Sequence, residues 1–160
     1  MTAMIDLEAR AHAGHPQELR LWLRLLACTQ LVERDLRTHL REQFDTTLPR
    51  FDLMAQLERK PEGLRMSELS QRMMVTGGNI TGITDQLTKE GLVERCEVEG
   101  DRRAFRVRLT PKGRQEFRAM AQAHEDWIVD ALGGLSSEEI HTLHQLLGKV
   151  KQHYLDMETV

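Results

Sequence analysis

The chain has 160 residues, of which 29% are charged and 40% are hydrophobic, and its formal net charge is −3 at pH 7. This composition is typical of a soluble globular protein of one domain and excludes a disordered chain. No apolar run is long enough to span a bilayer and no leader-like segment is found, so we expect a cytoplasmic protein that does not enter membranes. The two cysteines, Cys28 and Cys96, do not make a disulfide framework.

The charge is distributed unevenly along the chain. Residues 59–118 carry 13 Lys/Arg and 9 Asp/Glu, a net of +4, whereas the other residues together carry a net of −7. Nucleic-acid phosphates respond to a local basic region, so the acidic total does not exclude such a partner. A small positive excess is also within the ordinary variation between segments. The charge distribution by itself therefore does not decide whether the protein binds nucleic acid.

The first predicted element is a long helix from about Pro16 to Phe44. Its apolar residues recur at helical spacing: Leu19, Trp22, Leu23, Leu26, Val32, Leu36 and Leu40. The helix is longer than the average globular helix, and a small domain cannot cover its whole apolar stripe. The pattern therefore predicts a partner surface.

A second helix is expected after Thr46 or Thr47, either of which can cap it, with Pro49 in its first turn. Its predicted buried side chains are Phe51, Leu53, Met54 and Leu57. The sequence Lys-Pro-Glu-Gly at 60–63 ends it.

Two short helices and a hairpin follow. Ser67 is the expected N-cap of a helix to about Met73, and Thr76 is the expected N-cap of a helix to about Glu90 that stops at Gly91. Strands at 94–98 and 104–109 enclose a predicted turn at 99–102.

The last two predicted elements are helices. Thr110-Pro111 opens one that runs to about Leu132. After Gly133-Gly134, a capping box at 136–139 opens the other, which reaches about Met157. Its apolar stripe is Ile140, Leu143, Leu147, Val150 and Tyr154.

The helix predicted from Thr76 has two different sides. On a helical wheel Ile80, Ile83 and Leu87 share one narrow arc, which predicts that they face the core. Opposite lie Gly78, Gly82, Asp85 and Lys89, flanked by Asn79, Thr81 and Gln86. Glycines 77, 78 and 82 each cost a helix about 1 kcal/mol relative to alanine, which favours a close approach of the backbone to another surface.

DNA is a surface that this polar side fits. Asn79 and Gln86 can pair with adenine edges, Thr81 can contact a thymine methyl, and the helix N-terminus can bind a phosphate. The competing interpretation is a solvated face with chance glycines.

The hairpin concentrates arginine. Asp101, Arg102 and Arg103 lie at its predicted tip, and Arg106 and Arg108 are expected to share one exposed face of the outgoing strand. A basic tip on a narrow ribbon fits a narrow minor groove, and Asp101 can hold one arginine extended. An exposed charged turn is also commonplace, but its position directly after a helix-turn-helix favours DNA.

Two runs of residues carry a family resemblance. The wing and the next helix give Asp101-x-Arg103-xxx-Val107-x-Leu109-Thr110-xx-Gly113, preceded by Glu-Gly-Leu-Val-Glu-Arg at 90–95. These runs, and the layout of helices over about 19–154, resemble the MarR family of winged-helix transcription regulators.

The resemblance implies a mainly α fold with a small β-hairpin wing. A single domain at 1–160 would place a winged helix-turn-helix DNA-binding lobe (46–110) in a helical dimerisation frame (16–44 and 111–157). The family is homodimeric, with the first and last two helices interlocked. The helix from Thr76 to Lys89 would enter the major groove, and Arg103, oriented by Asp101, the minor groove. The predicted DNA-contacting residues are Thr76, Gly78, Asn79, Thr81, Gly82, Gln86, Lys89, Asp101, Arg102 and Arg103.

The function that the resemblance implies is a repressor of a pseudo-palindromic operator, released by a small-molecule effector. Residues 74–82 are similar to members that control aromatic-acid catabolism, including hydroxycinnamate regulators released by a coenzyme A thioester. The effector would be an aromatic carboxylate or its thioester. His39, Arg41 and Arg50 lie near the junction of frame and lobe, where family members bind small anions, although ordinary surface charge would also explain each.

Other functions remain as alternatives. Some relatives sense peroxides through a cysteine placed like Cys28, although this chain has one tyrosine, Tyr154, to support such a thiol, and an inert thiol is the competing interpretation. His141 and His144 do not complete a zinc site, so no metal or other cofactor is expected. No catalytic motif is present, which predicts that the protein is not an enzyme. An architectural DNA-binding protein without an effector, or a pure interaction module, stays open.

Overall fold

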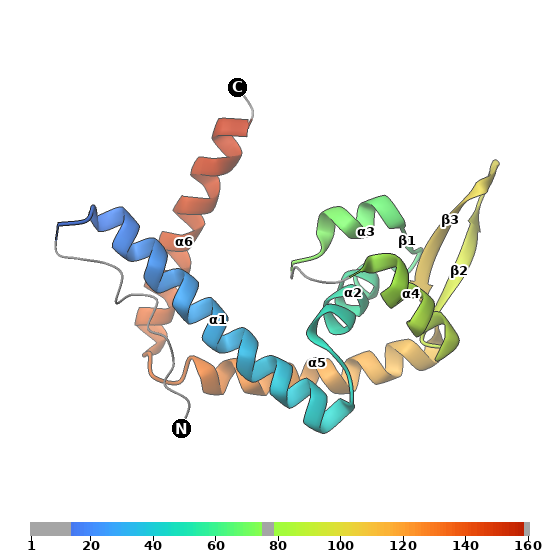
Figure 1. The fold of residues 1–160 in the computed structure, drawn as a ribbon, viewed down its shortest axis with the longest axis horizontal. Helices are drawn as coiled ribbons and strands as arrows, with labels where there is room; N and C mark the ends of the chain where they lie inside the picture. Colours follow the sequence, from blue (N-terminus) through green and yellow to red (C-terminus); the bar gives the residue numbers. More distant parts are fainter. Residues whose placement is uncertain (1–13, 75–78, 159–160) are drawn as a thin grey trace. The chain divides into compact units, whose positions relative to one another are not determined.

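The computed structural model describes residues 14–74 and 79–158 (Figure 1). In chain order the elements are α1 (Gln17–Phe44), α2 (Leu48–Glu58), β1 (Leu64–Arg65), α3 (Met66–Arg72), α4 (Ile80–Lys89), β2 (Val93–Val98), β3 (Asp101–Leu109), α5 (Pro111–Ala131) and α6 (Ser137–Glu158). The predicted fold class, mainly helical with a small antiparallel sheet, is confirmed. Two compact units meet within α5, one ending at Glu125 and the other beginning at Asp126. The predicted division into a frame and a lobe stays a prediction.

Helix α1 begins and ends where the sequence predicts. Pro16 precedes it, and the backbone at Asp45 turns into the left-handed region, with φ of 47°, to end it. Leu36 and Leu40 in its C-terminal part are buried, whereas Leu19 and Trp22 near its start are 39% and 56% exposed. Within the single chain, α1 therefore buries one end of its stripe and leaves the other uncovered.

Helix α2 supplies the centre of the core. The Thr47 hydroxyl caps it by accepting the backbone N–H of Arg50, 3.4 Å away. All four side chains predicted to be inward are buried. The largest fully buried side chains of the described residues are Leu40, Leu53, Met54, Leu57, Leu69, Leu87, Val93, Val107 and Thr84.

The sheet has three strands in the order β1-β3-β2, all antiparallel. Strand β1 was not predicted from the sequence, because a strand of two residues is too short to show an alternation of apolar and polar side chains. Gly63 before it has φ of +89°, and a Cβ there would lie 2.8 Å from the Val107 carbonyl oxygen, so only glycine lets the chain enter this close to β3.

The hairpin turn is shorter than predicted. Strand β3 begins at Asp101, so the turn is Glu99-Gly100, with Gly100 at φ of +84°, and not the four residues 99–102. A register irregularity between Glu97 and Val98 pairs Val98 with Asp101 and allows this tight reversal. Asp101 and Arg102 are consequently strand residues.

Two predicted helix starts are wrong. The N-cap of α3 is Arg65, whose backbone N–H donates to the Glu68 carboxylate at 2.8 Å, so Ser67 lies in the first turn. Helix α4 is capped by Asn79, not by Thr76, because the Asn79 side chain accepts the Gly82 N–H. Asparagine is a slightly better N-cap than threonine, and Asn79 directly precedes the first residue of the helix, Ile80. Thr76 and Gly78 lie outside the described residues.

The start of α5 is fastened to the loop before β2. The Thr110 hydroxyl accepts the Gly113 N–H at 3.0 Å and donates to the Gly91 carbonyl at 2.6 Å, and the Thr110 N–H donates to the Leu92 carbonyl. A Cβ on Gly113 would lie 1.8 Å from the Leu92 carbonyl oxygen. The leucine-threonine-x-x-glycine run is thus a close-packed corner between the sheet and a helix.

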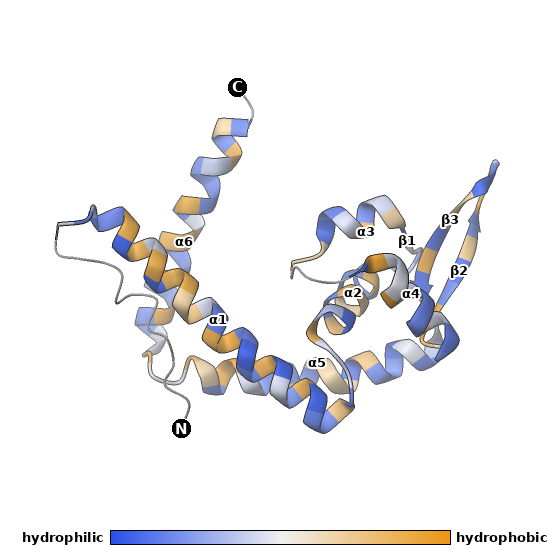
Figure 2. Ribbon diagram, viewed as in Figure 1, coloured by the Kyte–Doolittle hydropathy of each residue, from blue (hydrophilic) through white to orange (hydrophobic). Residues whose placement is uncertain are grey.

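Helix α6 opens with the predicted capping box. The Ser136 N–H donates to the Glu139 carboxylate at 2.7 Å, and the Ser136 hydroxyl accepts the Glu139 N–H at 3.2 Å. Apolar residues recur along α6 (Figure 2), yet none of its residues is buried in the single chain. Over residues 14–74 and 79–158, no helix is both long and apolar enough to cross a bilayer.

Candidate nucleic-acid interface

Helix α4 packs against α2, α3 and β2 with one side (Figure 1). Leu87 is fully buried, and Ile80 and Ile83 are half-buried, which supports the inward arc that the wheel predicts. The helical wheel did not predict that Thr84 is buried, although the residue is only 1% exposed. Its hydroxyl donates to the Ile80 carbonyl at 2.7 Å, so the buried oxygen is satisfied within the helix.

The opposite side of α4 is mostly exposed, although Asp85 on that side contacts β2. Thr81, Gln86 and Lys89 are exposed along it, and Asn79 is exposed at its N-terminus. Gly82 is half-buried, and a Cβ there would lie 3.2 Å from the Asn79 amide nitrogen. The structure thus gives Gly82 a local reason, because it leaves room for the capping side chain.

Asn79 is the N-cap of α4. Its Oδ1 accepts the Gly82 N–H at 3.1 Å, which satisfies one of the unpaired donors of the first helical turn. A bidentate contact to adenine needs the same oxygen as an acceptor. Any base contact by Asn79 must therefore share its oxygen with the cap.

Asp85 faces the wing. Its carboxylate pairs with Arg95 on β2 at 2.6 Å, and the Arg95 guanidinium lies over the Phe105 ring on β3, 4.7 Å from the centroid. Both members of the pair are about half exposed, so the pair orients more than it stabilises. Its effect is to tie the angle of α4 to the hairpin, through an Arg–Phe contact that the sequence analysis did not identify.

The end of α4 is held by α2. Arg50 donates to both oxygens of Glu90, the Nη1 bond being 3.0 Å long, and its Nε donates to the Thr46 hydroxyl at 3.1 Å. The Arg50 side chain is 15% exposed, and its hydrogen bond lowers the pKa of the Glu90 carboxyl. Lys112 from α5 donates to the Glu90 carbonyl. The C-terminal end of α4 is therefore fixed to two other helices.

The three residues expected at an effector site differ in their surroundings. Arg50 is engaged with Glu90, whereas Arg41 is exposed in the last turn of α1 and His39 is half-buried. Arg50 would have to exchange its carboxylate partner to bind an anion.

The far end of the wing is exposed and carries two adjacent arginines. Asp101, Arg102 and Arg103 are all exposed, and in the described part of the chain neither arginine side chain has an ion-pair partner. The Asp101 carboxylate accepts the backbone N–H of Arg103 at 3.0 Å, so the contact that orients Arg103 is with its main chain. The expected contact was with the arginine side chain.

The two arginines further along β3 are not alike. Arg108 is exposed and pairs with Glu94 on β2 at 2.7 Å, whereas Arg106 is half-buried. The register pairs Glu94 with Arg108 and Cys96 with Arg106, so both do lie on one face of the hairpin. The Glu94 hydrogen bond raises the pKa of Arg108 above its ordinary value.

Two other predicted features can be placed. Cys28 is exposed on α1 and Cys96 is half-buried on β2. Over residues 14–74 and 79–158, no three His, Cys, Asp or Glu side chains gather in a way that could hold a metal ion.

These features have counterparts in known proteins. Residues 44–104 match the model of the MarR family. The regulator PecS of Dickeya dadantii, an HTH-type transcriptional regulator, is 31% identical over 108 residues, which are 66% of this chain and 65% of PecS. The chain thus matches about two thirds of the length of that relative.

Solved structures extend the similarity to nearly the whole described chain. A MarR family transcriptional regulator from Silicibacter pomeroyi superimposes with a TM-score of 0.74 at 32% identity, covering 86% of this chain and 94% of the other. A mutant MarR from E. coli complexed with operator DNA gives a TM-score of 0.72 at 26% identity, covering 84% and 95%. The family expected from the wing motif is confirmed.

Proposed function

This chain belongs to the MarR family of winged-helix transcriptional regulators, and we propose that it binds a pseudo-palindromic operator as a homodimer and represses transcription until an effector releases it. The observation that carries the proposal is the exposed polar side of α4 beside a wing whose Arg102 and Arg103 have no ion-pair partner among the described residues. A similar chain has been solved with operator DNA. Family members are regulators and not enzymes, as the lack of catalytic motifs predicts.

In the proposed complex α4 lies in the major groove. Thr81 and Gln86 contact base edges, Gly82 lets the backbone approach, and Lys89 contacts a phosphate. Asn79, together with Thr76 and Gly78 before α4, completes the contact set at the start of the helix. Two copies related by a two-fold axis would engage half-sites about one helical turn apart.

The wing supplies the minor-groove contact. Arg103 and Arg102 at the start of β3 would enter the groove, where negative potential is concentrated if the groove is narrow. The Asp101 carboxylate fixes the backbone from which Arg103 extends.

Uncovered apolar side chains support the homodimer. Leu19, Leu21 and Trp22 on α1 are 39–56% exposed, and the stripe of α6 from Ile140 to Tyr154 is 41–61% exposed. Apolar surface of this extent marks an interaction site, and a second copy of the chain is the occupant we propose.

Effector release would act through differential affinity. We propose that an anionic effector, an aromatic carboxylate or its coenzyme A thioester, binds near His39, Arg41 and Arg50. An anion that takes Arg50 from Glu90 loosens the anchor of α4, and a preference of this kind is worth about 1–3 kcal/mol. An exposed Cys28 favours a second candidate, in which oxidation of the thiol releases DNA.

Operator selection tests the proposal. The full chain is used to select duplexes from a random pool, and fluorescence anisotropy then compares the selected palindrome with a shuffled duplex across salt concentrations. We expect a large preference for the palindrome and an affinity that falls steeply with salt. Equal affinity for both duplexes would instead identify an architectural DNA-binding protein, and no binding even at low salt would exclude both.

Two further arms address control of transcription. A reporter behind the selected operator should rise when the gene is deleted, whereas a fall would make the protein an activator. Peroxide treatment of the wild type and of Cys28→Ser separates effector control from thiol control, because thiol control requires that only the wild type lose DNA.

A further inference from the structure

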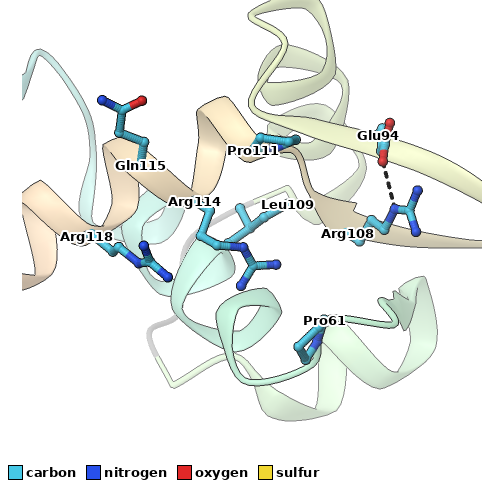
Figure 3. Close-up of a pocket in the computed structure, with 8 residues that line it drawn as sticks. All are labelled: Pro61, Glu94, Arg108, Leu109, Pro111, Arg114, Gln115 and Arg118. Carbon is cyan, nitrogen blue, oxygen red and sulfur yellow. Dashed lines mark hydrogen bonds and ion pairs between the residues drawn. The ribbon is translucent and has the colours of Figure 1, made fainter.

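An open cleft of about 650 Å³ lies at the root of the wing. Figure 3 shows its lining residues: Pro61, Glu94, Arg108, Leu109, Pro111, Arg114, Gln115 and Arg118. They come from the loop after α2, the paired ends of β2 and β3, and the first turns of α5. None of these residues belongs to the proposed DNA contacts or to the proposed effector site.

The sheet face that lines the cleft points away from the DNA-reading helix. Arg95 pairs with Asp85 of α4, so the side of β2 that carries Arg95 faces α4. Side chains alternate along a strand, so Glu94 and its partner Arg108 point to the other face. A duplex bound by α4 therefore does not fill this cleft.

Two of the three arginines in the cleft have no counter-charge in the described part of the chain. Arg108 is neutralised by Glu94 at 2.7 Å. Among residues 14–74 and 79–158, neither the Arg114 nor the Arg118 guanidinium has a hydrogen-bond or ion-pair partner. They stand four residues apart on α5, a spacing at which like charges destabilise a helix. An anion between them would relieve that repulsion.

The side chains of Arg114 and Arg118 extend to the same side of α5. In Figure 3 the guanidinium ends of Arg114 and Arg118 extend to the side of α5 on which Pro61 lies, while Gln115 extends the other way. Pro61 and Pro111 add exposed apolar surface to the same cleft, next to the buried Leu109.

We propose that this cleft binds a small organic oxyanion, a carboxylate or phosphate on a compact apolar body, with Arg114 and Arg118 as its ligands. Guanidinium groups recognise both oxyanions through paired N–H donors, and the volume lies within the range of small-molecule sites. Glu94 does not oppose the anion, because Arg108 holds its charge. The site is separate from the proposed function, and its occupancy can be measured without DNA.

Isothermal titration of the full chain with four probes tests the site. Benzoate and phenyl phosphate carry both an oxyanion and an apolar body, inorganic phosphate lacks the body, and benzyl alcohol lacks the charge. The test variant is Arg114→Gln/Arg118→Gln, and the control is Lys149→Gln/Lys151→Gln on α6, which removes the same charge elsewhere.

We expect at least one organic anion to bind saturably, and to bind about tenfold or more weakly to the test variant but unchanged to the control. Equal binding of inorganic phosphate would overturn the apolar part of the proposal, and equal binding of benzyl alcohol the charged part. Absence of saturable binding by every probe, or equal weakening in the control, would overturn the site. None of these outcomes depends on operator binding, so failure here leaves the DNA-binding proposal intact. An anion that binds the test variant as tightly as the wild type occupies another site, such as the one proposed near His39, Arg41 and Arg50, and would also overturn the cleft.

Discussion

The Oδ1 of Asn79 accepts the backbone N–H of Gly82 at 3.1 Å, and this one bond sets where the proposed DNA-reading helix begins. The residue predicted to contact a base is also the residue that closes the first turn. A change at Asn79 therefore alters the helix as well as the contact, and the two effects can be separated by choosing the replacement.

Replacing Asn79 by alanine and by serine makes that separation. Asn79→Ala should lower the free energy of unfolding by about 1 kcal/mol and weaken operator binding, because the cap is lost. Asn79→Ser keeps a capping oxygen and should retain stability while losing preference at one or two base positions. Denaturant unfolding and anisotropy on operators with single base changes measure both. If serine restores the base preference completely, Asn79 acts as a cap only.

Arg103→Ala should weaken operator binding about tenfold or more without unfolding the protein, because Arg103 is exposed and lacks an ion-pair partner in the described chain. The matched control is Arg34→Ala, at a side chain that is 60% exposed on α1. A mobility-shift titration compares the two. Unchanged affinity of Arg103→Ala would show that the wing assignment is wrong.

Two roles of Asp101, as a hydrogen-bond acceptor and as a negative charge, can be distinguished by substitution. The carboxylate accepts the Arg103 backbone N–H, and an asparagine oxygen can accept the same bond. We expect Asp101→Asn to bind the operator nearly as the wild type and Asp101→Ala to bind it more weakly. Equal loss in both variants, in the same titration, would mean that the negative charge orients the arginine side chain.

The Arg50–Glu90 pair predicts a pH dependence of stability. The Arg50 hydrogen bond lowers the pKa of Glu90 below its unfolded value. The pair therefore stabilises the protein above the ordinary carboxyl pKa, and this contribution is lost as the pH falls through the lowered value. A double-mutant cycle with Arg50→Gln and Glu90→Gln should give about 0.5–1 kcal/mol of coupling at pH 7, because Glu90 is half exposed, and none in acid. A coupling energy that does not change with pH would contradict the assignment.

Gly113→Ala should destabilise the protein by about 3 kcal/mol or more, because the new Cβ meets the Leu92 carbonyl oxygen of the main chain. Gly134→Ala is the control, since nothing lies within 4 Å of a Cβ there. Thermal unfolding should separate the two variants by many degrees. Similar midpoints would mean that the corner at Leu92 can relax.

Local chemistry allowed some helix ends to be predicted, although not the start of α3, where Arg65 and not Ser67 is the N-cap. Thr47 and Ser136 cap as expected, and the apolar spacing placed α1 to within a residue. The sequence left Thr46 and Thr47 open as caps of α2, and it favoured Thr76 over Asn79, the N-cap of α4.

Contacts between residues that are far apart in the sequence could not be predicted. Arg50 and Glu90 lie forty residues apart, and Asp85 and Arg95 meet only because β2 folds back on α4. The cleft at the root of the wing joins Pro61 to Arg118 and has no local signature. Periodicity identifies the outward residues of a helix, but not which of them another element engages.

The corner at Thr110 has a mechanical consequence. It joins α5 to the hairpin through hydrogen bonds to Gly91 and Leu92, and Gly113 leaves no slack between them. Strand β3 extends from this corner for nine residues, so its far end is a lever arm of about 26 Å. A tilt of about 5° at the corner swings the arginine-bearing end by about 2 Å. Small rotations at the base of the wing thus become displacements of about 2 Å at its tip, enough to make or break a hydrogen bond.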